Sequence, residues 1–596
     1  EISHEALLRG WATLRTWLES DAGRRLIHER LARAVEEWER LGRGDAGLWR
    51  DQQLAEIAGL EAAELKPLEL AFMSSAQDAV KRRRWRRRFI VAGVPLAVLL
   101  GVGSFRLHAS MERDKVVEKH LAAAAESIAE FRQRDAQATV LRNEAFRAFD
   151  QMNKKEGEEA WARTLRAATD SRNLLEKAAA ALDRAHVVDP GRSDVVAQMG
   201  QTYYDIAASS EAANTLTPAE EQRVQLYDES GELMKRWHAP GRVAISAGPP
   251  GANATLARYQ PTRVGGLALR PEGAIASLPA KLDLTPGSYL LTFAAPGFVD
   301  VRYPIKVTRG EATSIDVRFP RRAEIPAGFV PIPGGSFFFG AQEEVLRSQF
   351  FSTAPLHKMT TNAFLIAAHE TTFAEWIQFL EALPEPERSK RTPGLSDALT
   401  GGLALTKAHG KWRLRFRPNE RVFEANEGEP IEYPRAKAAK QDWLQMPVTA
   451  VSFQDALAYA GWLDATGRVP GARLCSEIEW ERAARGADPR RYPHGDLLTP
   501  TDANYLGTHG GDLDAIGLDE VGTHPASDSP FGVHDLAGNA FEWVTSTLSS
   551  GADDVVVFRS GSYFQSEVEL RTENRSPGAP TMRDIRCGLR ICAPWR

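Results

Sequence analysis

Cysteine is scarce in this chain of 596 residues, and its scarcity excludes a fold held together by many disulfides. The three cysteines are Cys475, Cys587 and Cys592, and none of them forms the Cys-x-x-Cys pair of a zinc or redox site. An excess of charge of one sign is also lacking, since the formal net charge is only -5 over this length. This balance predicts no particular affinity for nucleic acid. The chain is too long for one hydrophobic core, so we expect several domains.

Residues 1–80 repeat apolar side chains at helical spacing and predict a cytoplasmic helical bundle, with a membrane-surface role as the alternative. Gly42 ends an apolar stripe made of Leu7, Trp11, Leu14, Leu18, Leu26, Leu31, Val35 and Trp38. Residues 4–11 and 16–18 resemble the segment that closes the ATPase module of bacterial STAND-type signalling NTPases. This stretch has no glycine-rich phosphate loop, so we assign no nucleotide site to it. Because the helical pattern starts at Glu1, we expect a fragment whose missing N-terminal part is a STAND ATPase or a similar effector.

One long uncharged run, over residues 89–105, directly follows the basic octamer of residues 81–88. At 1.5 Å per residue it spans about 26 Å of a bilayer core of roughly 30 Å, and flanking arginines can snorkel to cover the difference. We therefore predict a basic flank and a single transmembrane helix within residues 81–108, in a bacterial inner membrane. The basic side places the N-terminus in the cytoplasm and the residues after about 110 in the periplasm or outside. A nucleic-acid patch and a buried core helix are the alternatives, and the seven positive charges of the octamer disfavour burial.

Two segments of different composition follow the predicted membrane helix. Residues 110–237 are rich in Ala, Glu, Arg and Leu and predict a helical stalk. Within the stalk, a helix–turn–helix pattern around Pro190 weakly resembles a tetratricopeptide pair, and a coiled or hairpin spacer is the alternative. Residues 240–320 change to a period of two with many turn residues, which predicts a small antiparallel β-domain. Residues 284–298 resemble the PEGA family of surface β-modules.

Residues 326–596 carry a series of motifs rich in Gly, Trp and Arg. His369-Glu370-Thr371-Thr372 starts a helix with a threonine cap. The other motifs are residues 329–340, 446–453, 471–486, 538–543, 559–563 and 588–593. In this order and spacing they resemble the formylglycine-generating enzyme (sulfatase-modifying factor) family. The resemblance implies a C-type-lectin-like α+β domain, so the expected fold class is multidomain, with a helical N-terminal part and stalk, a small all-β domain and this C-terminal domain.

The resemblance also indicates where catalytic residues would stand. Active members of the family oxidise a substrate cysteine with two copper-binding cysteines, and those positions are Gln565 and Leu570 in this chain. Soft Cu(I) prefers thiolate ligands, so we expect no copper and doubt the formylglycine-generating reaction. The related sulfoxide synthases use a His-x-x-x-His-x-Glu iron site, and no such run occurs here. The histidines at positions 357, 369, 494, 509, 524 and 534 are scattered singly, which favours packing roles.

The family pattern further implies structural calcium in the loop of residues 529–543. The expected ligands are Asp535, the carbonyls of Gly538 and Ala540, and Glu542, an oxygen-rich set that suits calcium. The alternative is that Glu542 is a buried carboxylate paired with an arginine such as Arg559 or Arg590. A second family site would use Asn504, Tyr505, Asp519 and Val521, with Asp519 one residue out of register.

A disulfide between Cys475 and Cys592 is a further hypothesis, because Cys592 falls where the family has a structural disulfide cysteine. The usual partner position, near Ala460, holds no cysteine, and Cys475 has appeared in the Arg-Leu-x-x-Glu motif instead. Cys587 would stay free, and an exterior compartment permits such a bond. Two free buried cysteines are the alternative.

These observations favour a membrane-anchored signalling or sensor protein whose exterior domain is not catalytic and binds a ligand or partner. The rigid scaffold can present variable loops. The candidate contact residues are Ser562, Gln565, Leu570, Arg571, Glu573 and Arg575. One alternative is a formylglycine-generating oxidase or another enzyme on the same fold. A second alternative is a display protein with a diversified lectin-like domain.

Overall fold

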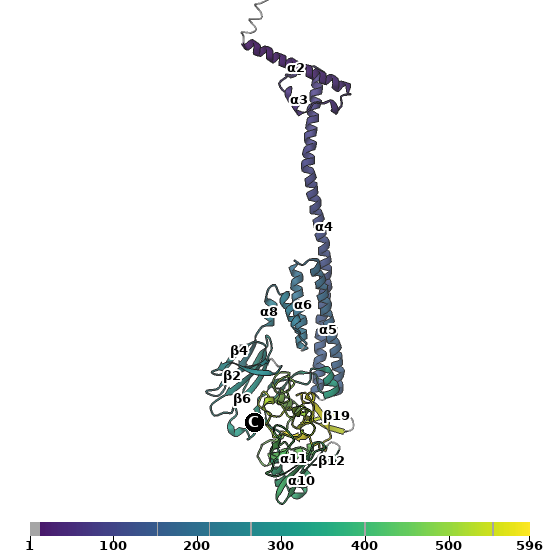
Figure 1. Cartoon of the computed structure of the whole chain (residues 1–596). Helices are drawn as coiled ribbons and strands as arrows, with labels where there is room; N and C mark the ends of the chain where they lie inside the picture. Colours follow the sequence, from purple (N-terminus) through teal and green to yellow (C-terminus); the bar gives the residue numbers. More distant parts are fainter. Residues whose placement is uncertain are drawn as a thin grey trace, which may run out of the picture. The chain divides into compact units, whose positions relative to one another are not determined.

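The computed structural model describes residues 12–595 except residues 152, 214, 263–264, 399–400 and 551–552. The chain divides into two compact units, Glu1–Lys119 and His120–Arg596. Figure 1 traces the chain in sequence colours, from purple helices to the yellow C-terminal strands. Leu7 and Trp11 of the predicted stripe lie outside the described residues, as do residues 4–11 of the STAND-like segment.

The first unit buries most of the described part of the predicted stripe. Its elements are α2 (Ala12–Arg40), η1 (Asp45–Gly47), α3 (Asp51–Glu56), η2 (Ala62–Glu64) and the start of α4 (Pro67–Asp150). Leu31 and Trp38 of α2 pack with Ile57 and Phe72 in one core, whereas Leu26 is exposed, contrary to the predicted stripe. The helix stops before Gly42, whose φ of 72° is the left-handed conformation that glycine adopts at helix ends.

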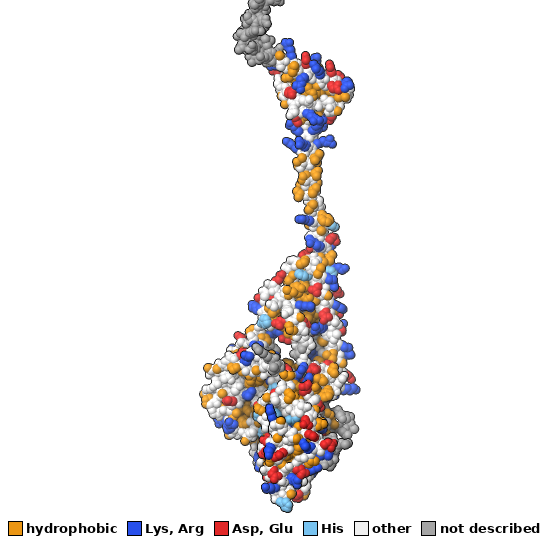
Figure 2. All heavy atoms as spheres, in the orientation of Figure 1, with side chains coloured by type: hydrophobic (Ala, Val, Ile, Leu, Met, Phe, Trp, Pro, Cys, Tyr) orange, Lys and Arg blue, Asp and Glu red, His pale blue; other side chains and the backbone are white. Residues whose placement is uncertain are grey.

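Helix α4 contains the predicted membrane segment without interruption. Its most apolar window has a mean hydropathy of 1.9 and is not buried, so by length and composition the helix can cross a membrane. Figure 2 shows the hydrophobic side chains of this segment as a continuous band, with Lys and Arg side chains next to it. The helix continues through residues 108–110 to Asp150, so the predicted boundary there is a change of composition and not a break in the helix.

The helical part of the second unit packs the end of α4 with α5 (Lys154–Val188), α6 (Ser193–Ala212), α7 (Pro218–Leu226) and α8 (Glu232–Trp237). Helices α5 and α6 flank Pro190, which confirms the predicted helix–turn–helix. Leu182 of α5 and Val195 of α6 are fully buried. Tyr203 of α6 stacks on Tyr227 after α7 with ring centroids 5.4 Å apart, so α6 is held on both sides.

The β-domain that follows has two sheets, ordered β4-β1-β7 and β3-β2-β5-β6. Its strands are β1 (Gly241–Ile245), β2 (Asn253–Pro261), β3 (Leu267–Ile275), β4 (Ala280–Leu284), β5 (Gly287–Ala294), β6 (Val301–Val307) and β7 (Ala312–Ile315). Val243, Phe293 and Val301 lie in its core. The prediction of a purely antiparallel domain is wrong in one pairing, because β1 and β7 run parallel. A parallel pair joins strands far apart in sequence, which local patterning does not reveal.

The C-terminal domain arranges short strands into several sheets, ordered β10-β9, β18-β23-β11-β8, β12-β13-β14-β15, β16-β17 and β21-β20-β19-β22. The strands are β8 (Phe329–Ile332), β9 (Gly335–Phe339), β10 (His357–Thr361), β11 (Phe364–Ala367), β12 (Gly394–Ala398), β13 (Gly401–Ala408), β14 (Lys411–Arg417), β15 (Phe423–Asn426), β16 (Ile431–Glu432), β17 (Lys440–Gln441), β18 (Arg473–Leu474), β19 (Phe541–Ser550), β20 (Asp553–Arg559), β21 (Arg575–Gly578), β22 (Cys587–Leu589) and β23 (Ile591–Pro594). The helices are η3 (Arg322–Glu324), η4 (Leu346–Phe351), α9 (Phe373–Ala382), α10 (Glu385–Arg391), η5 (Trp443–Gln445), α11 (Phe453–Ala465), α12 (Glu477–Arg485), η6 (Leu506–His509), η7 (Pro525–Ser527) and η8 (Glu567–Leu570).

Capping residues fix the starts of the three main helices in this domain. The hydroxyls of Thr372, Ser452 and Ser476 accept backbone N–H groups at the starts of α9, α11 and α12, each in a capping box. The threonine cap was predicted from the sequence. In the structure Cys592 of β23 is bonded to Cys475, with the Cα atoms 4.9 Å apart, and Cys587 is free and buried.

Candidate functional site

The loop of residues 529–543 bends sharply before it enters β19. Asp535 and Asn539 both have positive φ, 56° and 59°, and Gly538 has a φ of 88°. A Cβ atom at Gly538 would lie 2.3 Å from the carbonyl oxygen of Asn504, so only glycine fits there. The loop therefore turns its backbone inward against residues 504–505.

Glu542, at the end of this loop, is fully buried and paired with an arginine. Its Oε1 accepts hydrogen bonds from Arg590 Nη2 at 2.7 Å and Nε at 3.0 Å, and its Oε2 accepts one from Trp480 Nε1 at 2.6 Å. Burial would lower the pKa of Arg590, but the charge of Glu542 and the hydrogen bonds to it outweigh burial and raise that pKa. The structure thus contains the arginine pairing that the sequence left as an alternative, through Arg590.

Glu370 lies beside this pair, and its carboxylate has no hydrogen-bond partner, only a long ion pair with Arg590. It is fully buried, neither of its side-chain oxygens has a hydrogen bond, and Arg590 Nη2 is 3.7 Å from its Oε2. Burial raises the pKa of Glu370 well above its ordinary value, and the charge of Asp535 adds to the effect. The interior here holds three carboxylates, those of Glu370, Asp535 and Glu542, around the one guanidinium of Arg590.

This excess of negative charge suits a hard cation. Among the described residues, no group of three or more His, Cys, Asp or Glu side chains is arranged to hold a metal alone. A cation would therefore need backbone carbonyls, and the expected set supplies them at Gly538 and Ala540. Sequence reasoning missed Glu370, although the motif that contains it was visible, because the motif was interpreted only as a helix start.

The second expected metal site has a different chemistry. Asp519 is buried, and its carboxylate accepts hydrogen bonds from Arg435 and from His524 Nε2 at 2.9 Å. Burial would raise the pKa of Asp519, but His524 and Arg435 outweigh it and hold that pKa below its ordinary value. Asn504 leaves Oδ1 buried without a partner, yet its amide donates to the carbonyl of Gly517. Because Arg435 and His524 already bond the one carboxylate of this set, it has no excess of acid comparable to that around Arg590 and does not fit a divalent metal.

The two positions of the family's copper cysteines are filled by packed side chains. Leu570 is fully buried in an apolar cluster with Tyr492, Leu498, Ala503, Tyr505 and Ala537. Gln565 is 9% exposed, and its Oε1 accepts a hydrogen bond from the Ser562 hydroxyl. Neither position presents a metal ligand to an open cleft.

The remaining candidate contact residues take part in ion pairs. Arg571 Nη1 lies 2.9 Å from Glu343, and Arg575 Nη2 lies 2.8 Å from Glu477. Glu573 Oε2 accepts a hydrogen bond from Arg485 Nη2 at 2.9 Å. The structure therefore does not gather the six predicted residues around one cavity: three are packed inside, and three join a network of charges.

A polar pocket of about 370 Å³ borders this network. We call it the polar pocket, and it is lined by Gly340, Gln342, Glu343, Leu356, Arg485, Pro489, Arg491, Asp496 and Glu573. Of the six predicted contact residues only Glu573 lines it. Its two arginines, Arg485 and Arg491, could have been suspected from the density of arginine in residues 482–491, whereas nothing in the sequence singled out Glu343 and Asp496.

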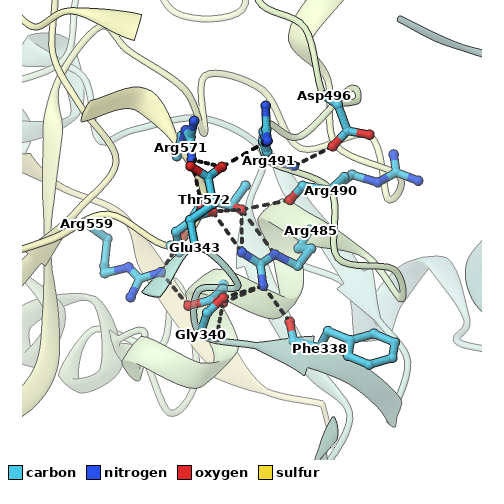
Figure 3. Close-up of polar contacts among 12 residues, drawn as sticks. Phe338, Gly340, Glu343, Arg485, Arg490, Arg491, Asp496, Arg559, Arg571 and Thr572 are labelled. Carbon is cyan, nitrogen blue, oxygen red and sulfur yellow. Dashed lines mark hydrogen bonds and ion pairs between the residues drawn. The ribbon is translucent and has the colours of Figure 1, made fainter. Parts of the chain in front are cut away.

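Arg485 forms the floor of the polar pocket and has no donor to spare. In Figure 3 its guanidinium points toward Gly340, Phe338 and Thr572, and it donates to the carbonyls of Phe338 and Gly340 at 3.0 and 2.9 Å. Burial raises the pKa of Glu573, although the charge of Arg485 opposes this rise. These buried groups fix the shape of the pocket.

The rim of the polar pocket is more accessible. Glu343 is shared by Arg491 and Arg571, each 2.9 Å from its Oε1. Asp496 accepts the backbone N–H of Arg491 at 3.0 Å, and the side chains of Arg491 and Glu343 are 48% and 44% exposed. The residues lining the polar pocket include no cysteine, serine or histidine, so what the pocket offers is charge and hydrogen bonds from carboxylate and guanidinium groups.

The two ends of the chain resemble known protein families in sequence. Residues 317–594 match the family model described as a sulfatase-modifying factor enzyme 1-like domain, and residues 1–46 match novel STAND NTPase 1. The chain is 30% identical over 234 residues to the formylglycine-generating enzyme of Mycobacterium tuberculosis, covering 36% of this chain and 73% of that protein. It is 28% identical over 262 residues to the inactive C-alpha-formylglycine-generating enzyme 2 of Bos taurus, covering 40% and 76%. It is 35% identical over 170 residues to the hercynine oxygenase of Mycolicibacterium thermoresistibile, covering 24% and 35%.

Proposed function

The chain belongs to the sulfatase-modifying factor family through its C-terminal domain, and from this premise we propose a membrane-anchored signalling protein whose C-terminal domain binds a ligand or partner without forming formylglycine. The match of residues 1–46 to a STAND NTPase supports a signalling role for the part that precedes α4. The relatives include both active enzymes and an inactive one, so the family name alone does not decide the activity.

The observation that carries this proposal is the filling of the two cysteine positions. Copper chemistry on this fold needs thiolates, and Leu570 can neither bind Cu(I) nor cycle through a disulfide. Leu570 also has no exposure, and its side chain completes an apolar cluster. A ligand that entered there would have to displace a packed side chain. The position is therefore closed to ligands and also lacks a catalytic side chain.

The membrane anchor rests on the exposed apolar segment of α4 and on the basic residues before it. In a soluble protein an apolar helix segment of this kind would be buried, whereas Phe89, Leu99 and Phe105 are each more than 65% exposed. The positive flank favours a cytoplasmic N-terminus in a bacterial inner membrane, with the C-terminal domain in the periplasm or outside. An exterior location also agrees with the disulfide between Cys475 and Cys592.

The polar pocket is the recognition surface that we assign to the C-terminal domain. Above a floor fixed by Arg485, its exposed rim at Arg491, Glu343 and Asp496 offers both donors and acceptors to a polar ligand. Because Glu343 already neutralises Arg491, an anionic group on a ligand would compete with Glu343 for that guanidinium. A ligand of this kind would act on the rim and leave the buried floor unchanged.

Calcium is the metal that we propose for this domain, as a structural ion. Asp535, Glu542 and the carbonyls of Gly538 and Ala540 would hold it, and Glu370 would supply the additional negative charge. The support is the carboxylate of Glu370, which has no hydrogen bond, and the excess of acid around Arg590. We expect added calcium to raise the melting temperature of the chain. Asp535→Asn should reduce that rise, whereas Asp170→Asn, at an exposed position in α5, should not.

The test of the functional proposal uses the whole purified chain in detergent. We measure Cu(I) uptake and the conversion of a Cys-x-Pro-x-Arg peptide under oxygen, with the Mycobacterium tuberculosis enzyme as the positive control. We expect neither stoichiometric copper nor aldehyde product from this chain. Turnover of the peptide would refute the proposal, and turnover without copper would show a different chemistry on this fold.

A further inference from the structure

A second cavity, of about 750 Å³, lies within the His120–Arg596 unit next to the polar pocket, with which it shares the lining residues Gln342 and Leu356. Its walls come from α4, α5 and α6 on one side and from residues 338–344 and 355–356 of the C-terminal domain on the other. We call it the junction cavity. Its volume falls in the range of sites that enclose small organic molecules.

The two sides of the junction cavity are tied together by buried contacts. Arg347, of which only 1% is exposed, donates two hydrogen bonds to Glu158 of α5, at 2.8 and 2.7 Å. His357 Nε2 lies 2.9 Å from Asp150 at the end of α4, and the His357 ring stacks on Phe146 at 4.5 Å. A site with walls fixed in this way is largely formed before a ligand arrives, which lowers the entropic cost of binding.

Aromatic and apolar side chains line most of the junction cavity. Phe131 and Phe146 lie on one face of α4, and Trp161 of α5 stacks on Phe146 with ring centroids 5.8 Å apart. The Trp161 indole N–H already donates to Glu344 at 2.9 Å, so the ring presents its apolar surface. Leu165 stands one turn further along α5 and is 39% exposed. This lining suits the apolar or aromatic body of a ligand.

Two carboxylates from facing helices meet this apolar lining. Asp135 of α4 and Asp205 of α6 both line the cavity. Gln201 donates to Asp205 Oδ1 at 2.7 Å, and burial raises the pKa of Asp205 above its ordinary value, with a smaller contribution from Asp135. Arg132 and Arg236 lie near Asp205 and oppose the rise, but neither lines the cavity.

The other charged residues of the lining are already accounted for. Glu344 is paired with Arg347 at 2.7 Å. Arg142 stands seven residues after Asp135 on α4, about 10 Å further along the helix axis. Among the residues that line the cavity, those with charge at the Asp135 and Asp205 end are therefore carboxylates, while the lining arginine stands toward the other end.

We propose that the junction cavity binds an organic amine with an aromatic or apolar body. The ammonium group would lie between Asp135 and Asp205, and the body would pack against Phe131, Phe146 and Trp161. Carboxylates attract the cation, and the faces of aromatic rings add to that attraction when the cation is partly removed from water. Because the walls belong to both the stalk helices and the C-terminal domain, the ligand would stabilise the junction between them.

The experiment compares three probes of similar size and different charge on the whole chain in detergent. These are 2-phenylethylamine, 2-phenylethanol and 3-phenylpropanoate, measured by isothermal titration calorimetry. We expect the amine to bind at least tenfold more tightly than either of the other two. Equal binding of the three probes, or tightest binding of the anion at Arg142, would overturn the proposal.

Variants locate the site. The double change Asp135→Asn and Asp205→Asn should lower the affinity for the amine at least tenfold and leave that for the alcohol unchanged. Asp170→Asn, exposed on α5 outside the cavity, is the matched control and should bind the amine as the natural chain does. Leu165→Trp would fill the cavity from a half-exposed position and should weaken binding of both the amine and the alcohol. Amine binding that survives both sets of changes would show that the amine binds elsewhere and would refute the assignment.

Discussion

Replacing Arg590 by methionine tests the charge balance in the interior of the C-terminal domain. The change removes three hydrogen bonds to Glu542, with lengths of 3.0, 3.0 and 2.7 Å, and leaves Glu370 and Glu542 buried without a cation. It also removes the donors to the carbonyls of Ala367 and His534. Breaking a buried ion pair on one side costs about 3–5 kcal/mol, so the folding equilibrium of this domain should shift by roughly 150- to 5,000-fold.

The assay is urea unfolding of the purified chain in detergent, followed by tryptophan fluorescence. Trp480 donates to Glu542 directly, so its emission reports on the environment of the altered pair. Arg322→Met, at an exposed position in η3, is the matched control and should unfold within about 0.5 kcal/mol of the natural chain. Calcium should recover part of the loss in Arg590→Met if it binds these carboxylates. An Arg590→Met chain as stable as the control would refute the reasoning.

Three further changes test separate parts of the domain. Glu370→Gln should stabilise the calcium-free chain at pH 7, because the pKa of Glu370 in the folded chain lies above the unfolded value of about 4.3. The stability of the natural chain therefore falls as pH rises from the unfolded pKa toward the folded pKa. Urea unfolding between pH 4 and 8 should show a flatter dependence of stability on pH in the variant. Leu570→Ala should lower the unfolding free energy by about 2–5 kcal/mol, because the side chain is fully buried, and a smaller loss in a melting experiment would mean that this position is open. Changing Cys475 and Cys592 together to serine opens a loop of 117 residues and should cost about 2–5 kcal/mol under non-reducing conditions, a difference that reductant should abolish.

Local chemistry was readable from the sequence because it depends on neighbouring residues. Gly42 ends α2, Pro190 separates two helices, and Thr372 caps α9, all through interactions within a few residues. The parallel pairing of β1 with β7 was missed because it joins residues about 70 positions apart. The order and spacing of the C-terminal motifs identified the family, because they sample the whole domain rather than one turn of it.

The candidate site was harder to predict, because the sequence shows which catalytic residues of the family are replaced but not where the replacing side chains point. Gln565 and Leu570 were recognised as non-catalytic, yet they were also expected to face a cleft, and the structure packs them inside. Burial of this kind depends on partners such as Tyr492 and Ala537, which are distant in the chain. The polar pocket was missed for the same reason, since its residues come from three separate segments.

The loss of the cysteines has a consequence for where recognition can occur. A copper site needs an open coordination position, whereas a buried leucine and a glutamine bonded to Ser562 close that position. The arginines next to it are held in place, because Arg485 donates to Glu573 and the terminal nitrogens of Arg559 donate to Glu477, Glu481 and the carbonyl of Thr572. Beside these closed positions, a polar ligand would therefore bind where charged side chains are still partly exposed, at the rim formed by Arg491, Glu343 and Asp496. Substitutions at that rim should change binding and leave folding intact, whereas substitutions at Arg485 should lower the stability of the domain.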